Sequence, residues 1–417
     1  MSKLKVLLKN LGPGLLFAST AIGTSHLVLS TKAGAQYGWV MIFPIVLANL
    51  FKYPFFEFGV RYTNVAGKTL IEGYRNRGKG YLWFYALITL VSTFTILAAL
   101  YTVTAGLFST LFDLSSVSTA YIALGLFIGI SLILIIGRYS FLETSLKFVI
   151  AILFTALIIT TALVIIKGPV AHVPDFSPPT VFNDAGILFL ISLMGWMPTT
   201  VEASSWVSLW SITKWKDEKH KPSLRESLQE FNFGYLSTAV LAVFFMIIGW
   251  FTLYGTHAEL SGNAVTFADQ IVRLFTVHIG PWAYLLIAVS AFATLFSSCM
   301  SAHDAITRVS LDIIDLLLPK YTLAGQRRFY AIGIILLAII NFTVVTAFSA
   351  NMGQLVALAT FVSFVVAPII GFMNLKNVMS SELPPHQRPG RGLQGLTYAG
   401  ILFLSVFSIY YFWMVIF

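Results

Sequence analysis

Two long apolar segments of this chain are interrupted in their middle by residues that disfavour a continuous helix. The first runs over residues 15–29 and is broken at 23–26, and the sixth runs over residues 187–210 and is broken at 195–200. Lipid cannot bond the backbone groups that a break frees, so a break inside a membrane is tolerated only where it lines a cavity. Matched breaks in the two halves of a chain are therefore the best sequence indication of a transporter substrate site.

The composition places these segments in a membrane. Of 417 residues 57% are hydrophobic and only 10% are charged, whereas a soluble domain carries about 25% charged residues. We predict an all-α polytopic membrane protein of about eleven transmembrane helices, since about 20 apolar residues make one crossing. The predicted spans are residues 12–32, 38–60, 82–112, 118–137, 143–167, 184–211, 230–255, 281–305, 329–349, 351–373 and 396–416.

The basic residues predict the orientation. Of the 26 Lys and Arg residues, Lys32, Lys167 and Arg273 fall in loops opposite the N-terminus, Lys52 falls within a span, and the others lie on the N-terminal side. The positive-inside rule then predicts a cytoplasmic N-terminus and an extracytoplasmic C-terminus. Separately, we expect the protein in the cell (cytoplasmic) membrane. This distribution explains the net charge of +9 without a nucleic-acid partner. The single cysteine, Cys299, excludes an intramolecular disulfide and a cysteine metal cluster.

The parity of the spans predicts an internal repeat. Spans one and six cross in opposite directions, and both are broken, so spans 1–5 and 6–10 are expected to form a 5+5 inverted repeat. The predicted transporter core covers residues 1–373, with spans 1–5 at about 12–167 and spans 6–10 at about 184–373. Residues 374–417 are expected to form a cytoplasmic loop and an eleventh span.

Several motifs resemble the NRAMP family of divalent metal transporters. They are Gly12-Pro13-Gly14 with the broken stretch and residues 33–38, the loop at residues 61–72, Met197-Pro198, and residues 368–370 with 374–379. The resemblance covers most of spans 1–10 and implies a LeuT-like fold with broken helices 1 and 6. It also implies a site at the two breaks.

The same comparison predicts a remodelled site. The family's first-helix motif Asp-Pro-Gly-Asn is replaced by Gly23-Thr24-Ser25-His26, so its metal-binding Asp and Asn are missing. The family's Met-Pro-His becomes Met197-Pro198-Thr199, and residues 95–110 of the third span contain no acidic residue. The resemblance therefore implies the fold, but not the family's metal site or proton path.

We predict that substrate-binding residues lie at the two breaks. These residues are Gly23, Thr24, Ser25, His26, Trp196, Met197, Thr199 and Thr200. The alternatives are a packing face of small residues at the first break and a plain proline kink at the second. His26 could instead bond a carbonyl of a neighbouring helix. Met197 is the one candidate metal ligand, because its thioether suits a soft transition metal, and cavity lining is the alternative.

Coupling-ion or gating candidates lie nearby in the spans. They are Glu202, Ser297, Ser298, His303 and Asp304. An intramembrane carboxylate such as Glu202 is a functional hypothesis by default, and its alternative is a structural partner for a basic residue. In sodium-coupled transporters of this type of fold, hydroxyls on the eighth helix help to hold Na⁺, although tight packing is the favoured interpretation of Ser297 and Ser298. His303 and Asp304 are candidates for an inner gate or a proton relay.

These features predict an alternating-access secondary transporter for a small solute other than a dehydrated divalent metal. Hard divalent ions need several oxygen ligands, normally with carboxylates, and the predicted pocket lacks them. The alternatives are a divalent metal transporter (Mn, Fe or Mg) that uses a partly hydrated ion, and a non-transporting sensor. No nucleotide-binding loop or HExxH-type motif is present, so we expect no enzyme. We also expect no cofactor, and a monomer whose partners are the substrate and the lipid bilayer.

Overall fold

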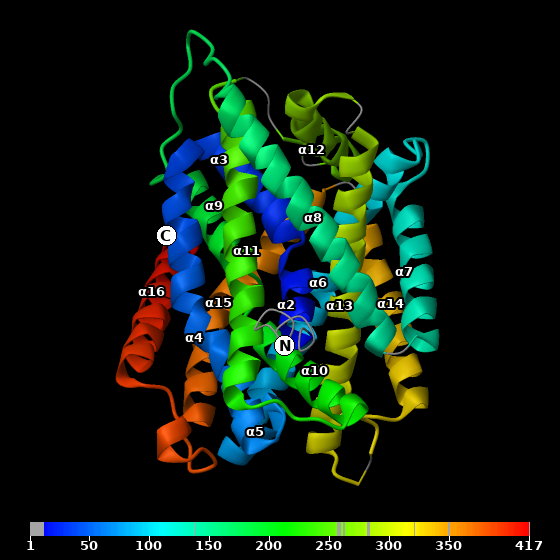
Figure 1. Ribbon diagram of the computed structural model, residues 1–417, viewed down its shortest axis with the longest axis vertical. Helices are drawn as coiled ribbons and strands as arrows, with labels where there is room; N and C mark the ends of the chain where they lie inside the picture. The colour runs from blue at the N-terminus through cyan, green and yellow to red at the C-terminus, as the bar shows by residue number, and fades with distance from the viewer. Residues whose placement is uncertain are drawn as a thin grey trace, which may run out of the picture.

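Helices account for the regular structure of the described residues, which are 12–137, 139–256, 260–261, 263–281, 284–320, 322–348 and 351–416 of a computed structural model. Figure 1 shows the longer helices standing side by side along the long axis of the molecule. The helices are α2 (Pro13–Ala21), the π-helix η1 (Ser25–Ser30), α3 (Thr31–Tyr37), the 3₁₀-helix η2 (Gly38–Met41), α4 (Ile42–Ala66), α5 (Leu70–Arg77), α6 (Lys79–Leu111), α7 (Thr119–Ile136), α8 (Tyr139–Lys167), α9 (Asp184–Gly195), α10 (Ala203–Glu218), α11 (Leu224–Leu253), α12 (Ala264–Ile279), α13 (Tyr284–Leu317), α14 (Arg327–Ala347), α15 (Met352–Val378), the 3₁₀-helix η4 (Pro385–Gln387) and α16 (Arg391–Ile416).

The helices follow the predicted spans. Each predicted span coincides with one helix or with one broken helix. By length and composition alone, seven stretches within the described residues are long and apolar enough to cross a membrane. One of these stretches, residues 25–66, joins the second half of span one to span two. The all-α membrane fold is therefore confirmed, and the protein is a multi-pass membrane protein.

Both predicted breaks are present. The first span divides into α2 and the continuous pair η1 and α3, with Ile22 and Gly23 between them. The sixth span divides into α9 and α10, with residues 196–202 between them. Helix α2 packs against α10, α11 and α13, which places the two broken helices together inside the bundle (Figure 1).

Glycines let α11 approach both halves of the first broken helix. A Cβ atom on Gly234 would lie 2.3 Å from the Gly14 carbonyl oxygen of α2, and one on Gly249 would lie 2.1 Å from the Thr31 oxygen of α3. A Cβ on Gly34 would lie 1.9 Å from the Met246 oxygen. Small residues at a helix contact allow such backbone approach in membranes. The break is thus held in place by close packing on either side of it.

A carboxylate binds the start of the first broken helix. The Glu230 Oε1 atom of α11 accepts hydrogen bonds from the Gly12 and Gly14 amides, at 2.7 Å each. The first amides of a helix lack intrahelical partners and carry the positive end of its dipole. Glu230 therefore stabilises α2 through both hydrogen bonding and charge.

Two helices lie in regions that the sequence analysis treated as loops. Helix α5 begins with a reciprocal capping box between Thr69 and Glu72, and α12 begins at Asn263, whose side chain accepts from the Val265 and Thr266 amides. Neither helix meets the length of a span, and α12 has one apolar face that packs on α6 and α13. These helices were missed because span counting registers only continuous apolar segments.

The loop between α15 and α16 is tied to α4 and α5 through one carboxylate. Glu382 accepts hydrogen bonds from the Tyr62 hydroxyl, the Lys68 ammonium and the Asn76 amide, each at 2.8 Å, and from the Arg77 guanidinium at 2.6 Å. Burial acts to raise the pKa of Glu382, but bonding to Lys68, Tyr62 and Asn76 outweighs it and holds the pKa below the ordinary 4.5.

This network predicts a pH-dependent loss of stability. A lowered carboxylate pKa stabilises the fold above the unfolded pKa, and the stabilisation is lost as pH falls through the folded value. We expect Glu382→Gln to lower the unfolding midpoint at pH 7 by the equivalent of about 1 kcal/mol, the upper range for a solvent-accessible ion pair; the Glu382 side chain is 19% exposed. The difference between wild type and variant should shrink below pH 4.5. A difference that stays constant from pH 7 to pH 3.5 would contradict this assignment.

Candidate functional site

The first break forms where α2 ends and the chain passes α13. A Cβ on Gly23 would lie 3.0 Å from the Ser298 Oγ atom and 3.3 Å from its Cβ, so only glycine permits this approach without adjustment. The Gly23 carbonyl accepts from the His26 and Leu27 amides, at 3.2 and 3.0 Å, and so begins the next helical segment. Glycine at this position thus combines a close helix contact with a change of helix direction.

The second break is enclosed by α15 on one side. A Cβ on Gly195, the last residue of α9, would lie 2.1 Å from the Thr360 carbonyl oxygen of α15. The Trp196 indole then donates to the Ser363 hydroxyl at 2.8 Å, and the Met197-Pro198 peptide bond is cis. The Pro198 carbonyl accepts from the Ser25 hydroxyl at 3.4 Å, which connects the second break to the first.

A small pocket lies between the two breaks. It has a volume of about 10 Å³, room for about one water molecule. It is lined by hydroxyl, aromatic and aliphatic side chains, namely Thr20, Thr24, Ser25, Ile96, Leu100, Trp196, Thr199, Thr200 and Trp206. Five of the eight predicted substrate residues line it: Thr24, Ser25, Trp196, Thr199 and Thr200.

One pocket hydroxyl has no partner. Thr24 is 1% exposed, and its Oγ1 atom forms no hydrogen bond within the described part of the chain. Buried polar groups normally have a hydrogen-bond partner. A free hydroxyl on the wall of the pocket is therefore available to a bound molecule.

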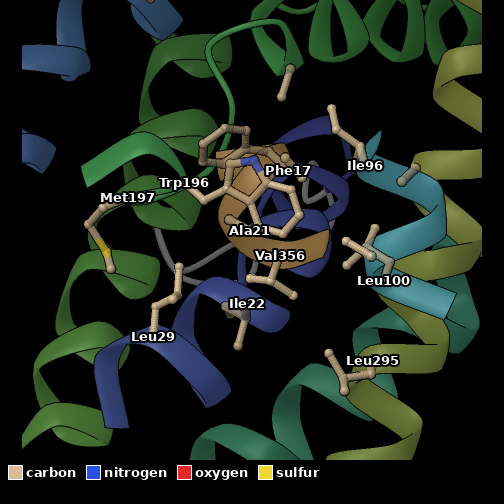
Figure 2. Packing of buried hydrophobic residues seen from close by; sticks show 14 of the residues in the cluster. Phe17, Ala21, Ile22, Leu29, Ile96, Leu100, Trp196, Met197, Leu295 and Val356 are labelled. Carbon is tan, nitrogen blue, oxygen red and sulfur yellow. The ribbon is translucent and has the colours of Figure 1, made fainter. Parts of the chain in front are cut away.

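Three of the predicted substrate residues do not line this pocket: Gly23, His26 and Met197. The fully buried His26 donates from Nε2 to the Thr238 carbonyl oxygen of α11 at 2.9 Å, and its Nδ1 lies 2.8 Å from the Ser25 Oγ atom. Both ring nitrogens therefore have protein partners. Met197 is also fully buried, and Figure 2 shows its side chain on the opposite side of Trp196 from Ile96 and Leu100.

Glu202 does not line the pocket, but it is hydrogen-bonded to the lining residue Thr200. It is 2% exposed, and its two carboxylate oxygens accept from the Ser92 hydroxyl of α6 at 2.5 Å and from the Thr200 hydroxyl at 2.6 Å. Among the described residues it forms no ion pair. It is the N-cap residue of α10, at the helix end where the dipole favours a negative charge. Thr200 joins this carboxylate to the pocket.

Ser297 and Ser298 form part of a hydroxyl seam between α2 and α13. The Ser298 hydroxyl lies 2.6 Å from the Ser19 carbonyl oxygen, and the Ser19 hydroxyl donates to Ser297 Oγ at 3.0 Å. The Thr20 hydroxyl lies 2.9 Å from that of Ser301. Each of these hydroxyls has a protein partner, which is the arrangement of a packed helix interface.

His303 and Asp304 are adjacent in sequence but have different partners. His303 donates from Nε2 to the Ile334 carbonyl oxygen at 3.0 Å, and its Nδ1 lies 2.9 Å from the Tyr101 hydroxyl. Asp304 accepts from the Trp210 indole at 2.9 Å, from Arg308 at 2.8 Å and from the Tyr330 hydroxyl at 2.6 Å. Asp304 thus links α10 to α13 and α14. It also lines a larger cavity of about 700 Å³ between these helices and α7.

The sequence analysis missed several residues of the site. Thr20, Ile96, Leu100 and Trp206 line the pocket without any motif to mark them. Lys52 was noted only as a charge within a span, yet it contacts the second break directly: its ammonium donates to the Met194 and Gly195 carbonyl oxygens at 2.5 and 2.8 Å. An ionisable residue in a membrane span is itself a signal of function, but its partner could not be read from the sequence.

Comparisons with known proteins identify the family of this chain. Residues 14–414 match the model of the Nramp family, described as natural resistance-associated macrophage protein-like. This chain belongs to the Nramp family. A family member in Pasteurella multocida, an uncharacterized protein, is 32% identical over 407 residues, which cover 96% of this chain and 90% of that protein.

Solved structures share the fold. A manganese transporter of Eremococcus coleocola superposes with a TM-score of 0.73 at 15% identity, over 98% of this chain and 87% of that one. MhsT, in complex with L-phenylalanine, gives a TM-score of 0.64 at 13% identity over 96% and 97% of the two chains. Mhp1, a nucleobase-cation-symport-1 family transporter, gives 0.61 at 14% identity over 97% and 92%. This member of the Nramp family therefore has the LeuT-like fold, and its family membership together with these transporter neighbours indicates a transporter.

Proposed function

We propose that this Nramp-family protein is a secondary transporter of a small organic solute, not of a dehydrated divalent metal ion. The observation that carries the proposal is the chemistry of the pocket between the breaks. Of the nine residues around it, none is an acid, a histidine, a cysteine or a methionine. The pocket instead offers threonine and serine hydroxyls between two indole rings.

This lining is unsuited to a divalent cation. Ca²⁺ and Mg²⁺ take six or more oxygen ligands, normally including carboxylates, and an uncompensated buried charge costs several kcal/mol even after relaxation. Glu202, the nearest carboxylate along the chain, already accepts two hydroxyl hydrogen bonds. Within the described residues, no group of three or more His, Cys, Asp or Glu side chains is arranged to hold a metal.

The lining suits an organic solute. The unpartnered Thr24 hydroxyl supplies a hydrogen bond, and the Trp196 and Trp206 rings supply flat apolar walls, a usual combination in small-molecule sites. The pocket of about 10 Å³ has room for about one water molecule, which is too little for an organic solute. Entry of the solute therefore requires α2 and α10 to separate from α6 and α13, which is alternating access.

Glu202 is the favoured candidate for the residue that couples solute transport to an ion gradient. Thr200 connects its carboxylate directly to the pocket, whereas His26 and His303 have both ring nitrogens bonded to protein atoms. Ser297 and Ser298 act as a packing seam. Asp304 of α13 accepts a hydrogen bond from Trp210 of α10. In this proposal the bond is part of the gate, and it breaks when α10 moves away from α13. The distribution of basic residues favours a cytoplasmic N-terminus.

A thermal-shift screen of the purified protein tests the proposed substrate class. We expect a small neutral, zwitterionic or anionic organic solute to raise the unfolding midpoint through ligand linkage, and Mn²⁺ and Mg²⁺ to leave it unchanged. Thr24→Val removes only the hydroxyl, so affinity for that solute should fall about tenfold, the loss of one hydrogen bond of about 1 kcal/mol or slightly more.

Thr161→Val is the matched control, because Thr161 in α8 is likewise buried with an unpartnered Oγ1 but lies outside the pocket. Its solute affinity should equal that of the wild type. Saturable micromolar Mn²⁺ stabilisation with no response to any organic solute would contradict the proposal and support transport of a partly hydrated metal.

A further inference from the structure

Lys52 is a fully buried cation whose described partners are backbone oxygens. Its side chain, on helix α4, is 0% exposed. Its Nζ atom donates to the Met194 carbonyl oxygen at 2.5 Å and to the Gly195 carbonyl oxygen at 2.8 Å. These two residues are the last two of α9, directly before the second break.

The end of α9 has the physical properties of a cation site. The last carbonyls of a helix lack intrahelical partners and carry the negative end of its dipole. In transporters with broken helices, unwound carbonyls and half-helix C-terminal ends coordinate the coupling cation. The Lys52 ammonium, a compact cation with three donors, meets the same two requirements: positive charge and hydrogen bonds.

No carboxylate competes for Lys52 among the described residues. The acid nearest along its own helix, Glu57, is paired with Arg61, whose Nε atom lies 3.0 and 3.1 Å from the two Glu57 oxygens. Glu202 is bonded to hydroxyls. A buried charge needs hydrogen-bonded compensation, and for Lys52 the end of α9 provides it.

The helices around the ammonium pack closely against one another. Gly195 is in backbone contact with Thr360 of α15, and α9 packs against both α4 and α15. Trp196, the next residue, lines the pocket. The position of the ammonium is thus enclosed by three helices and is one residue away from the pocket wall.

We propose that Lys52 is a tethered cation that permanently occupies the half-helix end at the second break and keeps free cations out of it. Together with Glu202 at the start of α10, it places a basic group at one half-helix end of the break and an acidic group at the other. The dipole charges of the two half-helix ends are then compensated by protein side chains and need no metal ion. The pocket therefore takes a solute of zero net charge. This substrate class rests on the function proposed above. The occupancy of the α9 end by Lys52 does not depend on that function.

Chemical rescue tests the occupancy directly. Lys52→Ala removes the ammonium and its stem, so the full-length protein should unfold several degrees below the wild type. Methylammonium at about 100 mM can place a free ammonium group in the space that the lysine side chain vacates. It should recover at least half of the decrease in unfolding midpoint. Na⁺ should also stabilise the variant. Wild-type protein, with the site filled, should respond to neither cation.

Three further samples separate this role from ordinary packing. Tetramethylammonium has the charge but no N–H donor, and it should not rescue Lys52→Ala. Lys52→Gln keeps a hydrogen-bond donor but has no charge. Its unfolding midpoint should remain below that of the wild type and should not respond to the added cations. Lys376→Ala, at an exposed lysine near the end of α15, should leave the midpoint unchanged.

Specific outcomes overturn the proposal. A Lys52→Ala protein that shows no cation response overturns it, and so does a Lys52→Gln protein with wild-type stability. If Lys52→Ala does not fold, cells grown with methylammonium should restore its yield, and failure to do so counts against the tethered cation. Failure of the solute screen with successful rescue would reject only the substrate class, because rescue reports on the half-helix end alone.

Discussion

Replacing Gly34 by alanine should prevent this protein from folding. The added Cβ would lie 1.9 Å from the Met246 carbonyl oxygen and 2.7 Å from the Trp250 amide nitrogen. Both atoms belong to the backbone of α11, which cannot change rotamer to make room. Ordinary overpacking costs about 1–3 kcal/mol, and a backbone clash at this distance separates α3 from α11 altogether. We expect no monodisperse protein on size exclusion.

Gly125→Ala is the control for this prediction. A Cβ on Gly125, within α7, would meet no atom within 4 Å, and alanine is favoured over glycine inside a helix by about 1 kcal/mol. This variant should be obtained in wild-type yield with an equal or higher unfolding midpoint. A Gly34→Ala protein of normal yield and midpoint would show that the α3–α11 contact is looser than described.

Replacing Glu202 by alanine should have the second large effect. The carboxylate is buried and accepts hydrogen bonds from Ser92 and Thr200. Its removal leaves two buried hydroxyls without their acceptor, at about 1–3 kcal/mol for each, and it frees the pocket residue Thr200 to turn. We expect a clearly lower unfolding midpoint and loss of solute flux in proteoliposomes.

Two other variants separate a role of Glu202 in coupling from a role in stability. Glu202→Gln keeps one acceptor oxygen and most of the volume, so it should recover stability while solute flux driven by a proton gradient stays abolished. Glu218→Ala removes a half-exposed carboxylate whose nearest base, Lys214, lies 3.5 Å away, and it should change neither measurement. Proton-driven flux at the wild-type rate in Glu202→Gln would remove Glu202 from the coupling mechanism.

Much of the site follows from local sequence. Gly23 and the stretch from Gly195 to Pro198 were expected to break their spans, because glycine and proline weaken a helix whatever surrounds it. The structure places both breaks there. Thr24 and Thr200, which lie at these breaks, line the pocket.

Side-chain direction was not available from local sequence. His26 follows Thr24 by two residues, yet its ring is bonded to the Thr238 carbonyl of α11, while Thr24 lines the pocket. Met197 carries a sulfur typical of a metal ligand, but it is buried away from that lining. Which face of a short irregular segment points inward depends on neighbouring helices, and spacing within the segment does not set it.

The sequence by itself determined the membrane class, the helical fold and the places where two helices break, because hydropathy, glycine and proline act over a few residues. Only the tertiary structure decided which charges meet those breaks. Lys52 and Gly195 are 143 positions apart, and Ser92 and Glu202 are 110 positions apart. A buried charge is compensated by whichever dipole or hydroxyl the packing of other helices brings within hydrogen-bond distance, and that packing is a property of the whole bundle.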